Sequence, residues 1–96
     1  MNLYTEIEKT FPIIEQQLSP KTRKQFIKWP AGKLYSYHFG LEMWIRNHFF
    51  FDHTKVPELH NLFVLNGFTH EDDMSHLILQ LFHYHLVKQE ESRTPS

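Results

Sequence analysis

Arg46 and Asn47 are the polar residues best suited to recognition chemistry, because they lie in the densest aromatic run of the chain, YSYHFGLEMWIRNHFFF at positions 35–51. A guanidinium group binds carboxylates and phosphates through two parallel hydrogen bonds. Aromatic rings beside an arginine are typical of protein interfaces, and they can also stack on a nucleotide base. The segment therefore predicts a surface that binds either a protein partner or a small anionic ligand. Its candidate residues are Arg46, Asn47, Trp44, His38, Phe50 and Phe51.

A structural use of Arg46 competes with this interpretation. The chain has an acidic run, EDD, at positions 71–73, and a bidentate pair between Arg46 and one of these carboxylates would join two helices. Glu42, four residues before Arg46, offers a surface pair worth only about 0.2–0.5 kcal/mol. We favour a structural clamp over a ligand-binding arginine, because structural ion-pair networks are common and no catalytic partner is evident. The clamp residues would be Arg46, Asp72, Asp73 and Ser75.

Metal binding and catalysis receive little support from the spacing of the candidate residues. Two metal-binding histidines on one helix need a separation of three or four residues, whereas His83 and His85 are two apart and His76 is two turns from His83. Ser75 and His76 are adjacent, so they diverge by about 100° on a helix and cannot form a nucleophile–base pair. We therefore expect no metal and no cofactor, and a binding protein more readily than an enzyme.

The charge and cysteine content exclude several classes of protein. Ten Lys and Arg residues against eleven Asp and Glu residues give a formal net charge of -1, so no overall field attracts nucleic acid or an anionic membrane. The basic stretch 21–33 is interpreted as a solvated face. The absence of cysteine excludes disulfides and cysteine-ligated zinc. Residues 1–18 show no signal-peptide pattern and no apolar run approaches the roughly 20 residues of a membrane helix, so we expect a cytoplasmic protein without a membrane span.

The length predicts one small domain, and the aromatic content predicts that some aromatic side chains remain exposed. Ninety-six residues fit a single domain with little excess stability. Nine Phe, four Tyr and two Trp residues bring more apolar surface than a monomer of this size readily hides. We therefore expect a homodimer or a surface that binds a partner. The domain is predicted over 1–88, and the polar segment 89–96 is predicted to be a disordered tail.

The first half of the chain has the pattern of two helical segments before the aromatic run. One apolar stripe covers 5–18, and Pro12 either kinks this helix or splits it into two. Ser19 and Pro20 form the N-cap and first position of a short basic helix over 20–29. The central helix is predicted over 33–49, where Gly40 favours the close crossing of a neighbouring helix.

The second half has the pattern of a loop followed by two helices. The loop is predicted over 49–57, and the short helix over 58–65 ends at Asn66-Gly67. Thr69 is expected to cap the last helix, with Asp72 three residues later in a capping box. The last helix, over about 70–88, shows the clearest amphipathic period. The resulting fold class is all-α, a compact bundle of four or five helices in which the central helix packs on the C-terminal helix.

The blocks HFGLEMWIRN (38–47) and HEDDMSHLI (70–78) resemble a family of small bacterial proteins of unknown function, with the pattern HFGLxxxIRN followed by HxDDxS. The resemblance covers about residues 7–86. The chain departs from the pattern at Glu42, where a small residue is usual, and at Phe49–Phe51, where Gly and Trp are common. The second departure suggests an altered partner or ligand surface. The resemblance implies that the positions of interest are His38, Gly40, Arg46, Asn47, Asp72, Asp73 and Ser75.

The function expected from these observations is that of a small interaction protein, of an immunity, antitoxin or counter-defence inhibitor type, which binds a protein partner through aromatic residues and Arg46. The alternative is a protein that binds or sequesters a nucleotide-like anion in a pocket at Arg46 and Asn47, and an enzyme of unknown type ranks third. A flat aromatic patch with Arg46 tied to Asp72 or Asp73 would favour the protein partner. A deep polar pocket would favour the ligand.

Overall fold

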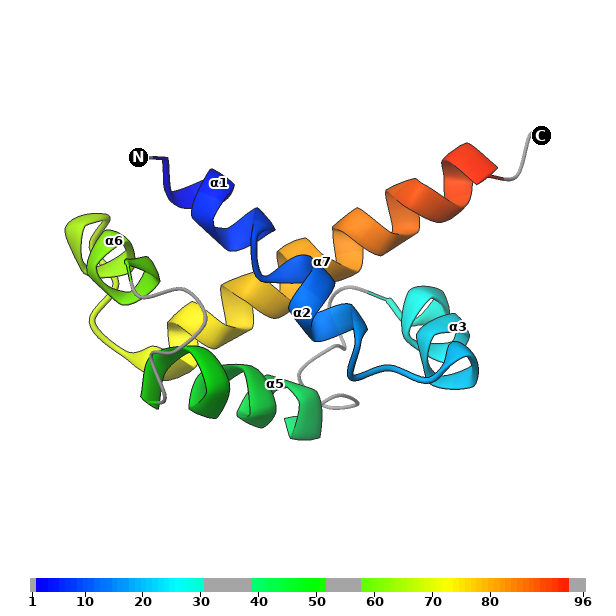
Figure 1. Cartoon of the computed structure of the whole chain (residues 1–96), viewed down its shortest axis with the longest axis horizontal. Helices are drawn as coiled ribbons and strands as arrows, with labels where there is room; N and C mark the ends of the chain where they lie inside the picture. The colour runs from blue at the N-terminus through cyan, green and yellow to red at the C-terminus, as the bar shows by residue number, and fades with distance from the viewer. Residues whose placement is uncertain (1, 31–38, 52–57, 94–96) are drawn as a thin grey trace.

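A computed structural model describes residues 2–30, 40–51 and 58–93 in full, and only the backbone of Phe39. All regular structure in these residues is helical, and the C-terminal helix packs against the others (Figure 1). The predicted all-α class is therefore confirmed. The elements in chain order are α1 (Leu3–Glu8), α2 (Phe11–Glu15), α3 (Pro20–Lys28), α5 (Phe39–Arg46), the π-helical turn η2 (Asn47–Phe51), α6 (Leu59–Leu65) and α7 (Glu71–Arg93).

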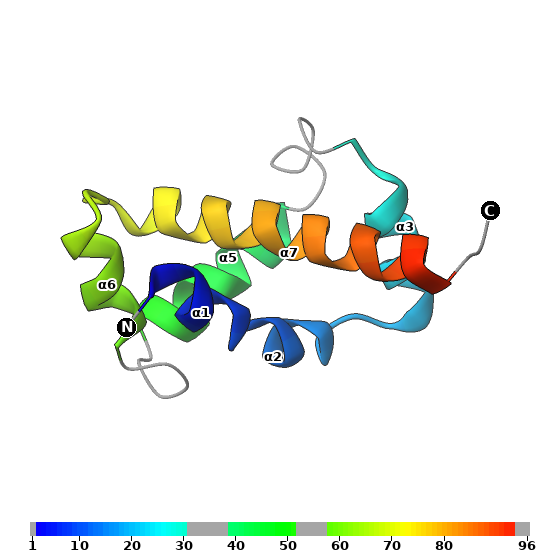
Figure 2. The same cartoon turned by 90° about the horizontal axis from the view of Figure 1, so that it is seen from above.

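Helix α7 is the axis on which the other elements are arranged. Figures 1 and 2 show it running along the length of the molecule, with α6 beside its first turns and α3 beside its last turns. Helix α5 contacts α7, α1 contacts α6, and η2 contacts α6. The aromatic segment therefore lies at the N-terminal end of α7, whereas the basic helix α3 lies at its C-terminal end.

Pro12 splits the first predicted helix instead of kinking it. Helix α1 ends at Glu8 and α2 begins at Phe11, with Pro12 in its first turn. A proline ring lacks the N–H donor and collides with the carbonyl four residues earlier, so one continuous helix is disfavoured. The Thr10 hydroxyl lies at the break and donates to the Ile7 carbonyl at 2.6 Å.

The local signals at α3 and α6 are confirmed. Ser19 Oγ accepts a hydrogen bond from the Thr22 backbone N–H at 3.1 Å, and Pro20 is the first residue of α3. Helix α6 ends at Leu65, and Gly67 follows with a φ of 93°. That conformation is costly for residues with a Cβ atom, so glycine suits this helix stop.

Both ends of α7 differ from the prediction. The helix begins at Glu71, and the His70 carbonyl accepts from the Met74 N–H at 3.2 Å, so His70 occupies the cap position expected for Thr69. Three acidic residues in the first turn suit the positive end of the helix dipole without a capping box. The helix also continues to Arg93, so the predicted end near Lys88 and the disordered tail are wrong for residues 89–93. Residues 94–96 lie outside the described part of the chain.

The central helix also departs from the sequence interpretation. Its described part begins at Phe39, and the predicted start near residue 33 falls outside the described residues. Helical structure continues through η2 to Phe51, so the loop predicted from residue 49 is wrong over 49–51. Apart from Gly40 itself, its two chain neighbours and the nearby backbone of its own helix, no described atom lies within 4 Å of the position that a Cβ on Gly40 would take. The close helix crossing expected at Gly40 is therefore not found among the described residues.

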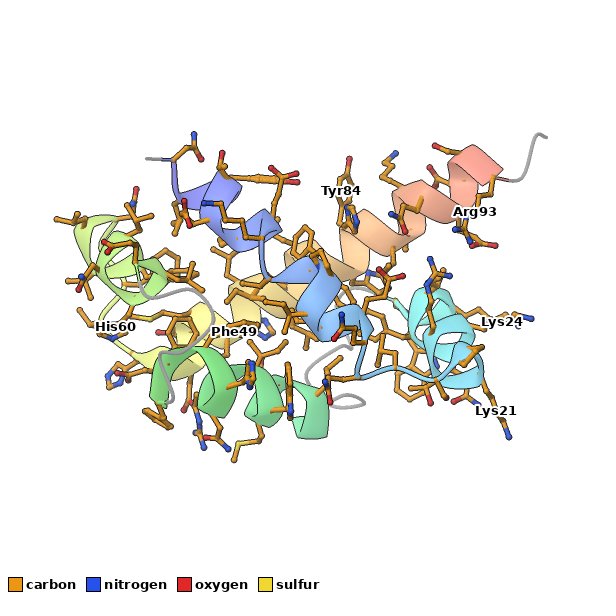
Figure 3. All side chains as sticks on the ribbon, in the orientation of Figure 1. Lys21, Lys24, Phe49, His60, Tyr84 and Arg93 are labelled. Carbon is orange, nitrogen blue, oxygen red and sulfur yellow. The ribbon has the colours of Figure 1, made fainter. Side chains whose placement is uncertain are left out.

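The hydrophobic core draws on every described helix. Phe49, fully buried, lies between the α5–η2 segment and α7 (Figure 3). Phe26 of α3 reaches the same core from the other end of α7, where its ring centroid is 5.7 Å from that of Phe82. The buried apolar residues are Ile7, Phe11, Ile14, Phe26, Ile45, Phe49, Phe50, Leu59, Phe63, Met74, Ile78, Leu79, Phe82 and Leu86.

Candidate functional site

Arg46, the last residue of α5, turns toward the start of α7. Its Nη1 atom donates to Asp72 Oδ1 at 2.9 Å, a contact between residues 26 positions apart in sequence. Asp72 belongs to the acidic first turn of α7, where the helix dipole already favours negative charge. The Asp72 side chain is 75% exposed. The structure therefore brings together two of the four predicted clamp residues, Arg46 and Asp72, through one contact at the surface.

Glu42 faces α7 and does not serve as a surface partner of Arg46. Its side chain is only 7% exposed, and its Oε1 atom lies 2.8 Å from His76 Nδ1. A carboxylate only accepts hydrogen bonds, so Nδ1 carries the proton in this contact. The sequence analysis missed this pair. A signal was available, because Glu42 lies three residues before Ile45 and seven before Phe49 and thus shares their buried stripe.

A third polar contact joins α6 to the same turn of α7. His60 Nε2 lies 3.4 Å from Glu71 Oε1, and Figure 3 shows His60 where α6 meets the start of α7. Glu71, Asp72 and His76 therefore each contact a different residue of the preceding helices. The first two turns of α7 form the place where α5 and α6 are joined by polar contacts.

The remaining clamp candidates do not contact the Arg46 guanidinium. Ser75 is fully buried and its Oγ donates to the Glu71 carbonyl at 2.8 Å, so its hydrogen bond is satisfied inside α7. Asp73 is exposed in the first turn of the helix. The described clamp thus consists of Arg46 and Asp72.

The adjacent residues Phe50 and Phe51 have opposite environments. Phe50 is 2% exposed, and its ring centroid lies 5.6 Å from that of Phe63. Its assignment as a binding residue is therefore wrong, because its ring is enclosed in the core. Phe51 is 59% exposed, and the Arg46 guanidinium carbon lies 5.6 Å from the centre of its ring, within cation–π distance.

The other binding candidates lie around this pair. Asn47 is exposed at the start of η2. Trp44 is half-buried and stacks on His48, with ring centroids 4.5 Å apart and an interplanar angle of 11°. His38 lies outside the described residues. We call the group formed by the partly buried Arg46 and the exposed residues Asn47, Phe51 and Asp72 the Arg46 face.

The described ranges contain neither a metal-binding cluster nor a helix suited to a membrane. Within them, no group of three or more His, Asp or Glu side chains is placed so that it could hold a metal ion. None of the described helices combines the length and the apolar character needed to cross a bilayer.

A family model for a domain of unknown function, DUF6794, matches residues 5–86. The chain belongs to this family. The resemblance inferred from the blocks HFGLEMWIRN and HEDDMSHLI is therefore confirmed, and in the DUF6794 domain these blocks form α5 and the first turns of α7. The Arg46–Asp72 and Glu42–His76 contacts link one block to the other. Neither curated proteins nor solved structures gave a significant match to the chain.

Proposed function

We propose that this DUF6794 domain is a protein-interaction module that binds a partner protein through the Arg46 face. The observation that carries this proposal is the position of Phe51, a largely exposed ring beside a guanidinium that is itself held by Asp72. Aromatic and arginine side chains are the residues enriched among the strongest contributors to protein interfaces. Exposure of much of a phenyl ring to water is unfavourable, so covering Phe51 would contribute to binding.

The geometry supports a protein partner more strongly than a small anion. Asp72 already neutralises part of the Arg46 charge at 2.9 Å, and an anionic ligand would have to compete with this carboxylate. A partner surface can cover Phe51 without displacing Asp72. The ion pair also fixes the Arg46 side chain before binding, which lowers the entropy lost on association.

We base the type of partner on the small size of the chain, on the lack of a catalytic constellation in its sequence and on the Arg46 face. The chain is small and has no catalytic constellation recognisable in its sequence. We therefore favour an inhibitory binding role of the immunity, antitoxin or counter-defence type. A second copy of the chain is an alternative partner, because Leu65 and Val64 of α6 are also exposed.

Site-specific crosslinking tests the proposal. A photoreactive phenylalanine analogue is placed at position 51 in the full chain, and at position 84 as a control. Tyr84 is a suitable control because it is 57% exposed, similar to Phe51, but lies on α7 away from the Arg46 face. We expect a defined protein adduct from position 51 in cells of the source organism and none from position 84.

A pair of substitutions completes the test. Phe51→Ser should abolish recovery of the adduct partner with the tagged chain, whereas Tyr84→Ser should leave it intact and both variants should keep their helical circular dichroism. Equal recovery with both variants would contradict the proposal. The anion alternative predicts instead that Asp72→Asn strengthens nucleotide binding measured by calorimetry, because it removes the competing carboxylate.

A further inference from the structure

A pocket of about 350 Å³ lies between α3 and the last turns of α7, far from the Arg46 face. Its α3 residues occupy positions i, i+1, i+4 and i+5 and therefore share one helical face. Glu90 and Arg93 are one turn apart on α7, so the pocket exists only because α7 continues past Lys88. Its volume falls in the range of about 300–1,000 Å³ typical of small-molecule sites. The lining residues are Arg23, Lys24, Ile27, Lys28, Glu90 and Arg93.

One of the four basic residues in this pocket is fixed by polar contacts. The Arg23 side chain is only 17% exposed, and its Nε atom donates to Glu15 Oε1 at 3.1 Å. Its Nη2 atom donates to Gln89 Oε1 at 3.3 Å, and its Nη1 atom lies 3.7 Å from Glu90 Oε2. Arg23 thus joins α2, α3 and α7, and its charge is balanced by the neighbouring carboxylates.

The other three basic residues have no such partner among the residues that the structure describes. Within the described part of the chain, Lys24, Lys28 and Arg93 form no ion pair or side-chain hydrogen bond. Lys24 and Lys28 are four residues apart on one face of α3, where like charges repel. A bound anion would relieve this repulsion and would satisfy several ammonium and guanidinium donors at once.

The pocket also offers apolar surface beside these charges. Ile27 is half-buried and packs against the core, and the methylene stems of Lys24 and Lys28 flank it on α3. A simple inorganic anion would leave this surface in contact with water. A molecule with an anionic group and an apolar portion would cover it and gain from its burial.

We propose that this pocket binds a small organic phosphate or carboxylate, with the anionic group at Lys24, Lys28 and Arg93 and the apolar portion against Ile27. The site goes beyond the Arg46 face and is independent of it. Asp72 and Arg93 lie at opposite ends of α7, roughly 30 Å apart at about 1.5 Å per residue. Figure 3 shows Lys24 and Arg93 at this end of the molecule and Lys21 directed further from Arg93.

Three probes distinguish the possible ligands: phenyl phosphate, benzoate and inorganic phosphate, each titrated at low salt into the full ¹⁵N-labelled chain. We expect phenyl phosphate or benzoate to cause saturable amide shifts centred on residues 23–28 and 90–93. Whichever of the two binds more tightly identifies the preferred anionic group. Inorganic phosphate should bind at the same residues more weakly, because it leaves Ile27 uncovered.

Two matched double variants test the role of the charges. Lys24→Gln with Lys28→Gln should weaken binding of the preferred probe by about tenfold or more, because it removes two charged donors. The control, Lys21→Gln with Lys88→Gln, also removes two positive charges, one from α3 and one from α7. Neither residue lines the pocket. This control should keep the affinity within about twofold, as should Phe51→Ser.

Three results would overturn the proposal. The first is the absence of saturable shifts at the pocket for all three probes. The second is an equal loss of affinity in the control variant, which would mean that only overall charge matters. The third is inorganic phosphate binding as tightly as the organic probes, because no apolar contact would then contribute. None of these results bears on the Arg46 face, whose own test uses Phe51.

Discussion

The two ends of α7 use charge in opposite ways. At the N-terminal end, Glu71 and Asp72 contact basic side chains of α6 and α5, and His76 contacts the buried Glu42. At the C-terminal end, Lys24, Lys28 and Arg93 gather beside a pocket without ion-pair partners among the described residues. Paired charges fix the order of neighbouring helices, whereas unpaired charges remain available to a ligand. The two ends therefore differ in whether their charged side chains pair across helices or lie without a described partner.

The contacts at the N-terminal end differ in their expected strength. Asp72 is largely exposed, and exposed ion pairs contribute only about 0.2–1 kcal/mol because water and salt screen them. Glu42 is nearly buried, so loss of its partner leaves a carboxylate with little access to water. The pair that the sequence analysis missed is therefore expected to matter more for stability than the pair that it proposed.

The largest expected effect concerns the core beneath the N-terminal end. Phe50→Ala should lower the free energy of unfolding by about 3–5 kcal/mol, because it leaves a cavity against Phe63. The neighbouring change Phe51→Ala should stay within about 0.5 kcal/mol, because its ring is already largely in water. Urea denaturation followed by circular dichroism measures both values. Similar losses in the two variants would show that the exposed ring also contributes to the core.

A smaller effect compares the two cross-helix pairs through double-mutant cycles. Alanine substitutions at Glu42 and His76 should give a coupling energy of about 1–3 kcal/mol, as expected for a hydrogen bond to a nearly buried charge. The same cycle for Arg46 and Asp72 should give less than about 1 kcal/mol. Chemical denaturation at pH 6 supplies the energies. A larger coupling for Arg46 and Asp72 would restore the strong structural clamp inferred from the sequence.

The smallest effect belongs to the C-terminal end. Lys24→Gln should change the free energy of unfolding by no more than about 0.5 kcal/mol, and the change should be stabilising at low salt because it relieves repulsion by Lys28. High salt should remove the difference between the variant and the wild type, since it screens the repulsion. Thermal unfolding at two salt concentrations tests both statements. Marked destabilisation by Lys24→Gln would mean that this lysine has a structural partner, and the contrast between the two ends would fail.

Signals that act over a few residues were readable in the sequence. Ser19 and Pro20 started α3, and Asn66-Gly67 ended α6, because a cap or a positive φ involves only the adjacent turn. Signals that compete locally were less reliable. Thr69 was expected to cap the last helix, but the helix begins one residue later and His70 occupies the cap position.

The structure over 89–93 and at Phe50 depends on contacts with other helices, which the local sequence does not show. Gln89 and Glu90 are polar, and polarity alone predicted a disordered tail, but Arg23 of α3 contacts both residues in the folded chain. Phe50 and Phe51 are the same residue type in sequence. Adjacent side chains on a helical turn point in different directions, so the packing of η2 places the Phe50 ring on Phe63 and leaves Phe51 largely in solvent.

Local patterns in the chain were enough to predict the helical class, the helix boundaries that have strong caps, the family, and the two blocks that meet at the start of α7. The tertiary structure decided which partner each charged side chain takes: His76 for Glu42, Asp72 for Arg46, and no described partner for Lys24. Helical periodicity tells which residues share a face, but a contact also requires that a second element bring its own residues to that face. That second requirement depends on how α3, α5 and α6 pack on α7, and it is met only in the folded chain.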